Sequence, residues 1–116
     1  MSKHPSPSEI TVQELQQQLI NNSSSLQLID VREITEIELA SIENFQVLPI
    51  SSYPSWSETI LTDFDPNQET IVLCHHGIRS AQMCYWLANK GFSNVKNVVG
   101  GIDAYSRLVD DRIPRY

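Results

Sequence analysis

Apolar positions along the chain follow two different periods. Short runs of apolar, β-branched residues predict strands at 26–31, 47–50, 70–74 and 95–99. Apolar residues three and four positions apart predict helices at 11–21, 35–42, 55–64, 80–90 and 102–109. Because strands that alternate with helices pair in parallel, this pattern predicts an α/β fold with a parallel sheet flanked by helices on both faces.

The run 70–74 is almost wholly apolar, which is typical of a strand buried on both faces at the centre of a parallel sheet. Pro49 removes a ladder donor and makes 47–50 a weaker strand. Thr11 and Glu14 have the spacing of a capping box, and Gly91 is a natural helix end. Ligands of parallel sheets bind beyond the carboxyl ends of the strands, where Cys74 lies.

Composition narrows the classes of function. A chain of 116 residues fits one domain, and we expect residues 1–8, rich in Pro and Ser, to be a flexible segment before a single domain at 9–116. The net charge of −6, without a basic run, excludes an electrostatic footprint for nucleic acid or an anionic membrane. Without a membrane-spanning or signal-peptide stretch, we expect a cytoplasmic protein with both cysteines as thiols.

The segment after the buried strand carries the candidate chemistry. It reads Cys74-His75-His76-Gly77-Ile78-Arg79-Ser80. A tight glycine-containing loop that leads into a helix favours an anion through its backbone N–H groups and the helix dipole. Arg79 adds a cation with a planar set of donors, and Ser80 offers a hydroxyl and a helix cap. These groups favour Cys74 as the nucleophilic thiolate and also favour an anionic substrate.

Three blocks in order resemble the rhodanese-like domain family. The loop is similar to the family's Cys-x-x-Gly-x-Arg-Ser active-site loop, and 28–33 resembles its early strand with an Asp-x-Arg motif. Residues 100–105 resemble its late Gly-Gly motif, so the likeness covers about residues 10–110. The family commonly has Pro-Gly-Ala where this chain has Glu43, Asn44 and Phe45.

The resemblance implies a thiosulfate sulfurtransferase of the rhodanese type. Cys74 would take sulfane sulfur from a small anionic donor such as thiosulfate, become a persulfide, and pass the sulfur to cyanide, a thiol or a protein partner. By the same resemblance the substrate-binding residues are His75, His76, Gly77, Ile78, Arg79 and Ser80. No cofactor beyond the covalent persulfide is expected.

Other residues have plainer interpretations. Asp30 and Arg32 flank a strand end near the site and form either a structural ion pair or a supporting substrate contact. Cys84 falls on the apolar stripe of helix 80–90 and is expected in the core, beyond disulfide reach of Cys74. Because adjacent side chains rarely converge on one ion, no metal site is expected at His75 and His76.

Two rival classes of function remain open from the sequence. Cysteine phosphatases and arsenate reductases also place cysteine and arginine in an anion loop. The four residues between Cys74 and Arg79 are one fewer than in phosphatases of similar architecture, which favours sulfur transfer. A non-catalytic sulfur carrier or sensor, which delivers persulfide to a protein partner, is the other alternative.

Overall fold

Five parallel strands form one sheet in the computed structural model, which describes residues 8–116. The strand order is β1-β5-β4-β2-β3, and every pairing is parallel. The strands are β1 (Ser8–Ile10), β2 (Gln27–Asp30), β3 (Gln46–Val47), β4 (Thr70–Leu73) and β5 (Val95–Val98). The predicted α/β class with a parallel sheet is confirmed.

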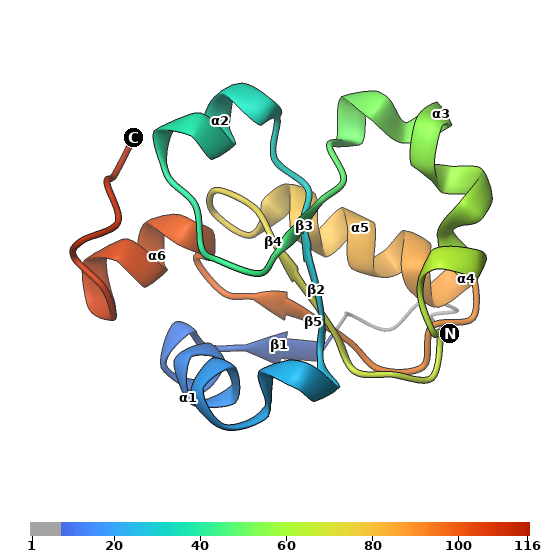
Figure 1. The fold of residues 1–116 in the computed structure, drawn as a ribbon, viewed down its shortest axis with the longest axis horizontal. Coiled ribbons are helices and arrows are strands. Elements are labelled where there is room, and N and C mark those ends of the chain that lie inside the picture. The colour runs from blue at the N-terminus through green and yellow to red at the C-terminus, as the bar shows by residue number, and fades with distance from the viewer. Residues whose placement is uncertain (1–7) are drawn as a thin grey trace, which may run out of the picture.

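Helices cover both faces of this sheet, as the sequence pattern predicted. They are α1 (Val12–Asn22), α2 (Ile34–Leu39), α3 (Tyr53–Trp56), α4 (Ile60–Asp63), α5 (Ile78–Asn89) and α6 (Gly101–Leu108). One apolar core joins α3, α4 and α5 to the sheet, and a second core joins α1 and α6 to the opposite face. In Figure 1, α3 lies above the strands and α1 lies below them. None of the helices within 8–116 is long and apolar enough to cross a membrane.

The sequence signals for burial and capping are confirmed at their positions. Ile71, Val72 and Leu73 of β4 are fully buried, as expected for the central strand of a two-sided core. At the start of α1, the Thr11 hydroxyl accepts from the Glu14 amide at 3.1 Å, and the Glu14 carboxylate accepts from the Thr11 amide at 2.9 Å.

Several predicted boundaries are wrong. The flexible segment predicted at 1–8 lies outside the described residues except for Ser8, which begins β1 along β5. The predicted helix 35–42 begins at Ile34 and ends at Leu39, because Ala40 is already extended. Asn44 adopts a left-handed φ of 75°, a conformation that asparagine tolerates better than most residues.

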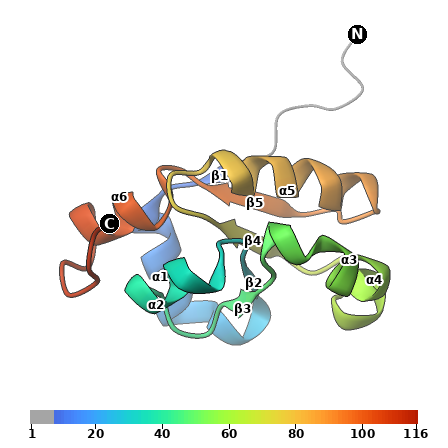
Figure 2. The same ribbon diagram turned by 90° about the horizontal axis from the view of Figure 1, so that it is seen from above.

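The segment between β2 and β4 differs most from the prediction. The strand predicted at 47–50 is only Gln46–Val47, since Pro49 has no N–H and Ile50 begins a 3₁₀ turn. The helix predicted at 55–64 is divided into α3 and α4 by the 3₁₀ turn Ser57–Thr59. Figures 1 and 2 place α2, α6 and the C-terminal segment together at one end of the sheet.

Candidate active site

Cys74 follows the last residue of β4 and lies at the carboxyl end of the sheet. Its side chain is buried, and its Sγ accepts a hydrogen bond from the backbone N–H of Gly77 at 3.0 Å. This return of the chain requires the left-handed φ of 97° at Gly77, where an added Cβ would also lie 3.2 Å from the Val98 carbonyl oxygen. Gly77 therefore serves the tight turn that the sequence predicted at this position.

The start of α6 fixes the cysteine loop through two backbone hydrogen bonds. The Ile102 amide donates to the Cys74 carbonyl at 2.9 Å, and the Asp103 amide donates to the His75 carbonyl at 3.1 Å. The backbones of α6 and of the loop approach so closely that a Cβ on Gly101 would lie 2.5 Å from the Cys74 carbonyl oxygen. The N–H and C=O groups of one peptide point in opposite directions. Because the carbonyls of Cys74 and His75 point at α6, the amides of His75 and His76 point away from it.

A buried polar chain connects the sulfur to β5. The Ser80 hydroxyl lies 3.2 Å from the Cys74 Sγ and donates to the Oδ1 of Asn97. Asn97 in turn donates from Nδ2 to the Gly77 carbonyl at 3.0 Å, which fixes the orientation of its amide. A hydroxyl has one proton, so Ser80 accepts from a Cys74 thiol in this arrangement and must rotate to donate to a thiolate.

Ser80 does not cap the helix, contrary to the prediction. Helix α5 begins at Ile78, and its N-cap is Gly77, which makes no side-chain capping bond. The helix starts two residues earlier than predicted because the positive φ of Gly77 turns the chain directly into it. The α5 N-terminus, with its positive dipole end, therefore lies immediately beside the cysteine loop.

Arg79 is already paired with an acidic residue. Its two terminal nitrogens donate to the carboxylate of Glu36, on α2, at 2.7 and 2.9 Å. This pair lowers the pKa of Glu36 to about 2, chiefly through the hydrogen bond from Arg79. The hydrogen bond to Glu36 also raises the pKa of Arg79, and the negative charge of Cys74 contributes. Arg79 supplies the positive charge that was expected beside the thiolate, but the carboxylate of Glu36 largely neutralises it.

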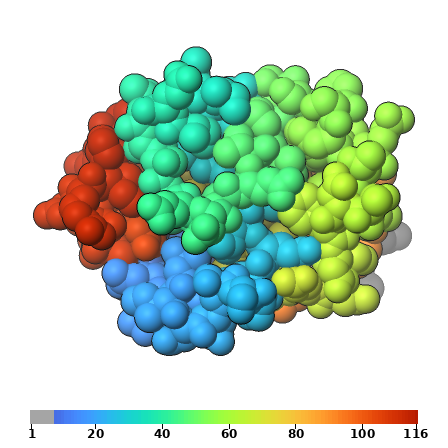
Figure 3. Space-filling view, in the orientation of Figure 1, coloured from blue at the N-terminus to red at the C-terminus, as the bar shows by residue number. Residues whose placement is uncertain are grey.

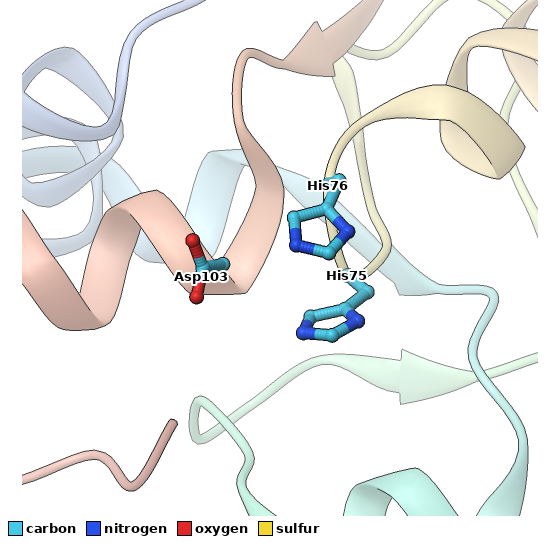
Figure 4. Close-up of side chains that lie close together, drawn as sticks. All are labelled: His75, His76 and Asp103. Carbon is cyan, nitrogen blue, oxygen red and sulfur yellow. The ribbon is translucent and has the colours of Figure 1, made fainter. Parts of the chain in front are cut away.

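The two histidines of the loop lie next to Asp103, from the first turn of α6 (Figure 4). The rings of His75 and His76 stack at a centroid distance of 3.9 Å, and Tyr116 stacks on the other side of His75 at 3.9 Å. Burial, followed by repulsion from His76, lowers the pKa of His75. Both effects disfavour the charged form of the His75 ring.

The ring geometry and the ion pairs of this cluster do not favour a metal site in the observed conformation. The possible ligand atoms of His75, His76 and Asp103 lie within 4.8 Å of one another. An imidazole nitrogen binds a metal in the plane of its ring at about 2.0–2.1 Å. The rings of His75 and His76 are stacked, with centroids 3.9 Å apart and planes inclined by only 29°, so their nitrogens are not directed at one common point. The Asp103 carboxylate, moreover, already accepts from Arg107 at 3.3 Å and from Arg115 at 3.1 Å.

Asp30 and Arg32 form the predicted ion pair, and they form it inside the protein. Their side chains are 1% and 0% exposed, with the closest contact at 2.8 Å. Arg32 also donates to the Ala40 carbonyl at 2.9 Å and to the Tyr116 hydroxyl at 2.9 Å. Every one of these bonds is internal, so the geometry favours a structural role over a substrate contact.

Cys84 is in the core, as expected from its place on the apolar stripe. It is fully buried beside Met83 and Leu87 in the core under α5, and both cysteines are free. Burial, together with the charge of Cys74, raises the pKa of the Cys84 thiol to about 12. Cys84 is therefore an inert packing residue at neutral pH.

Two polar residues at the site, Asn97 and Glu36, were not predicted from the sequence. Asn97 is 5% exposed on a strand between two apolar cores, and a polar side chain at such a position requires partners. Glu36 has capping-box spacing from Glu33, and its carboxylate accepts from the Glu33 amide at 3.0 Å. These two patterns were the available signals, but neither indicates that the side chain reaches the cysteine loop.

The fold and loop define a class of protein: a parallel α/β domain that presents a cysteine in an amide-lined loop at the start of a helix. Residues 11–108 match the Rhodanese-like domain family, and the chain belongs to this family. The family predicted from the three sequence blocks is therefore confirmed.

Several known proteins are similar to the chain. It is 48% identical over 90 residues to the Rhodanese-like/PpiC domain-containing protein 12, chloroplastic, of Arabidopsis thaliana, covering 78% of this chain and 30% of that protein. It is 35% identical over 80 residues to the thiosulfate sulfurtransferase GlpE of Vibrio cholerae, covering 69% and 72% respectively. A rhodanese-like domain protein from Staphylococcus aureus superposes with a TM-score of 0.74 at 28% identity, covering 94% of this chain and 98% of that one.

Proposed function

We propose that the chain is a sulfurtransferase that moves sulfane sulfur from a donor such as thiosulfate to a thiophilic acceptor through a persulfide on Cys74. The observation that carries the proposal is the placement of the Cys74 Sγ, which accepts from the Gly77 amide at 3.0 Å at the start of α5. Family membership and the name of the Vibrio relative support the reaction class. The chain spans less than a third of the Arabidopsis relative, so the activity of the whole protein belongs to the proposal too.

The reaction needs little proton transfer. The Cys74 thiolate attacks the outer sulfur of thiosulfate, the S–S bond of the donor breaks, and sulfite leaves with the bonding electron pair. The outer sulfur stays on Cys74 as a persulfide anion, held by the loop amides and the α5 N-terminus. Cyanide or a thiol then attacks that sulfur, and Cys74 returns as the thiolate.

The loop argues against phosphate chemistry. Four residues separate Cys74 from Arg79, and the terminal nitrogens of Arg79 already bind Glu36. A phosphoryl group must lie within the cradle with its oxygens bound and its phosphorus in line with the sulfur. A short ring of amides suits a single outer sulfur better than a whole phosphate. We expect negligible hydrolysis of aryl phosphates.

The test is sulfur transfer from thiosulfate to cyanide, followed by the appearance of thiocyanate. Cys74→Ser should abolish turnover, because a hydroxyl is not ionised at neutral pH. Cys84→Ala is the matched control, since it alters the other buried cysteine and should retain activity. Activity that survives in Cys74→Ser contradicts the proposal. Loading of Cys74 with negligible turnover, restored only by a protein acceptor, would instead favour the sulfur-carrier alternative.

A further inference from the structure

The carboxylate of Glu36 is held at the mouth of the cysteine loop from several sides. Arg79 binds both of its oxygens, and the Tyr116 hydroxyl donates to Oε1 at 2.9 Å. The Glu33 amide donates to Oε2 at 3.0 Å as part of the α2 capping box. Tyr116 is in turn held by Arg32 and by its stack on His75. Figure 3 shows the C-terminal segment, in red, beside the α2 region, in teal. Glu36 is therefore a fixed charge rather than a mobile surface side chain.

This fixed charge changes the electrostatics of donor binding. The side chains of Arg79 and Glu36 are 34% and 19% exposed, so both lie partly out of water, where charges interact more strongly than in bulk solvent. The guanidinium that would attract an anionic donor is matched by a carboxylate at 2.7 Å. Attraction for an anion is left to the loop amides and the helix dipole, in a chain of net charge −6.

We propose that Glu36 is a specificity-determining residue that disfavours anionic sulfur donors, so that the preferred donor is the persulfide of an uncharged or cationic thiol rather than thiosulfate. This inference rests on the proposed sulfur transfer through Cys74. Ile78, the first residue of α5, is 72% exposed beside the cysteine loop and would offer an organic donor an apolar contact.

The donor step balances without a further reactant. The Cys74 thiolate attacks the terminal sulfur of a persulfide R–S–SH, and the S–S bond of the donor breaks. The thiol R–S⁻ leaves with the electron pair, and Cys74 becomes Cys74–S–SH. R also sets the pKa of the leaving thiol and so the intrinsic rate of each donor. The electrostatics of the site is therefore read from the change that a variant or added salt makes in the ratio between donors.

The experiment compares two small persulfides with opposite charges on R, those of cysteamine and mercaptoacetate, together with thiosulfate. The rate at which sulfur loads onto Cys74 is read from the protein mass at short times. Because a unit charge acts twice as strongly on a dianion as on a monoanion, Glu36→Gln should raise kcat/KM by about tenfold for thiosulfate and about threefold for mercaptoacetate persulfide. The value for cysteamine persulfide should not rise.

Two control variants separate charge from structure. Glu38→Gln makes the same change in net charge at an exposed position of α2 and should leave the donor preference unaltered. Glu36→Asp keeps the charge and should keep the wild-type preference. Equal changes for all donors in Glu36→Gln, or the same shift in Glu38→Gln, would overturn the inference.

A measurement on the unmodified protein covers the case in which Glu36→Gln fails to fold. Wild-type protein at low salt should prefer cysteamine persulfide to mercaptoacetate persulfide, and added salt should reduce the preference. A preference that added salt leaves unchanged overturns the inference while leaving sulfur transfer intact. If no donor loads Cys74, the proposed function itself is overturned.

Discussion

Replacement of Arg32 by methionine separates a structural role of the buried ion pair from a substrate contact. Arg32→Met preserves much of the side-chain length but removes the charge and all the guanidinium donors. The variant leaves the Asp30 carboxylate buried at 1% exposure with no cation beside it. It also removes the bonds from Arg32 to the Ala40 and Glu36 carbonyls, at 2.9 and 3.4 Å.

The expected loss of stability is large. Breaking a buried pair by removing one partner costs about 3–5 kcal/mol, against a total of about 5–15 kcal/mol for a typical domain. Arg32→Lys keeps a positive charge but cannot donate to Asp30, Ala40 and Tyr116 at once, so its loss should be smaller. Arg112→Met is the matched control. Arg112 pairs with Asp110 at 87% exposure, and its removal should leave the free energy of unfolding unchanged within error.

Urea unfolding, followed by the fluorescence of Trp56 and Trp86, measures the free energy of unfolding of each variant. Sulfur transfer is measured in parallel and expressed per folded molecule. If the pair of Asp30 and Arg32 is structural, Arg32→Met should strongly lower the free energy of unfolding, while the folded fraction retains its KM for the donor. Unchanged stability together with a raised donor KM would refute the reasoning and make Arg32 a substrate contact.

Three further predictions concern other parts of the site. Because burial raises the pKa of Cys84 to about 12, native protein at mildly alkaline pH should be alkylated only on Cys74, and Cys74→Ser should react only after unfolding; a second label in the native state contradicts this. Glu36, with a pKa lowered to about 2, contributes stability that is complete above the ordinary pKa of glutamate and is lost as the pH falls below it. Glu36→Gln should therefore reduce the loss of unfolding free energy at acidic pH by about 1 kcal/mol after allowance for solvent screening, as measured by urea unfolding across acidic pH. Asn97→Ala should cost about 1–3 kcal/mol and slow the loading of sulfur, since the Gly77 carbonyl and Ser80 both lose their partner; unchanged stability and loading would show the polar chain to be dispensable.

The sequence predicted the sheet, its central strand and the cysteine loop because their signals are local. An apolar run that ends at Cys74 and is followed by Gly77 specifies the strand and the turn through neighbouring residues alone, whereas the helix begins two residues earlier than predicted. The late Gly-Gly block was recognised by resemblance, and its physical reason appeared only in the structure. Gly101 leaves no room for a Cβ against the Cys74 carbonyl, a contact between residues far apart in the chain.

The electrostatics of the site could not be predicted in the same way. Arg79 and Glu36 are 43 residues apart, and only the packing of α2 beside the loop brings them together. Tyr116 reaches Glu36 across 80 residues and stacks on His75 as well. The edge strand β1 was missed because Ser8–Ile10 is too short to show a period and depends on pairing with β5.

The most direct test of the account is the mass of the protein before and after treatment with a sulfur donor. Thiosulfate or a small persulfide should add the mass of one sulfur atom, the addition should map to the peptide that contains Cys74, and cyanide should remove it. Cys84→Ala should behave like the wild type, and Cys74→Ser should gain nothing. A sulfur atom found on Cys84, or no addition from any donor, would contradict a Cys74 persulfide.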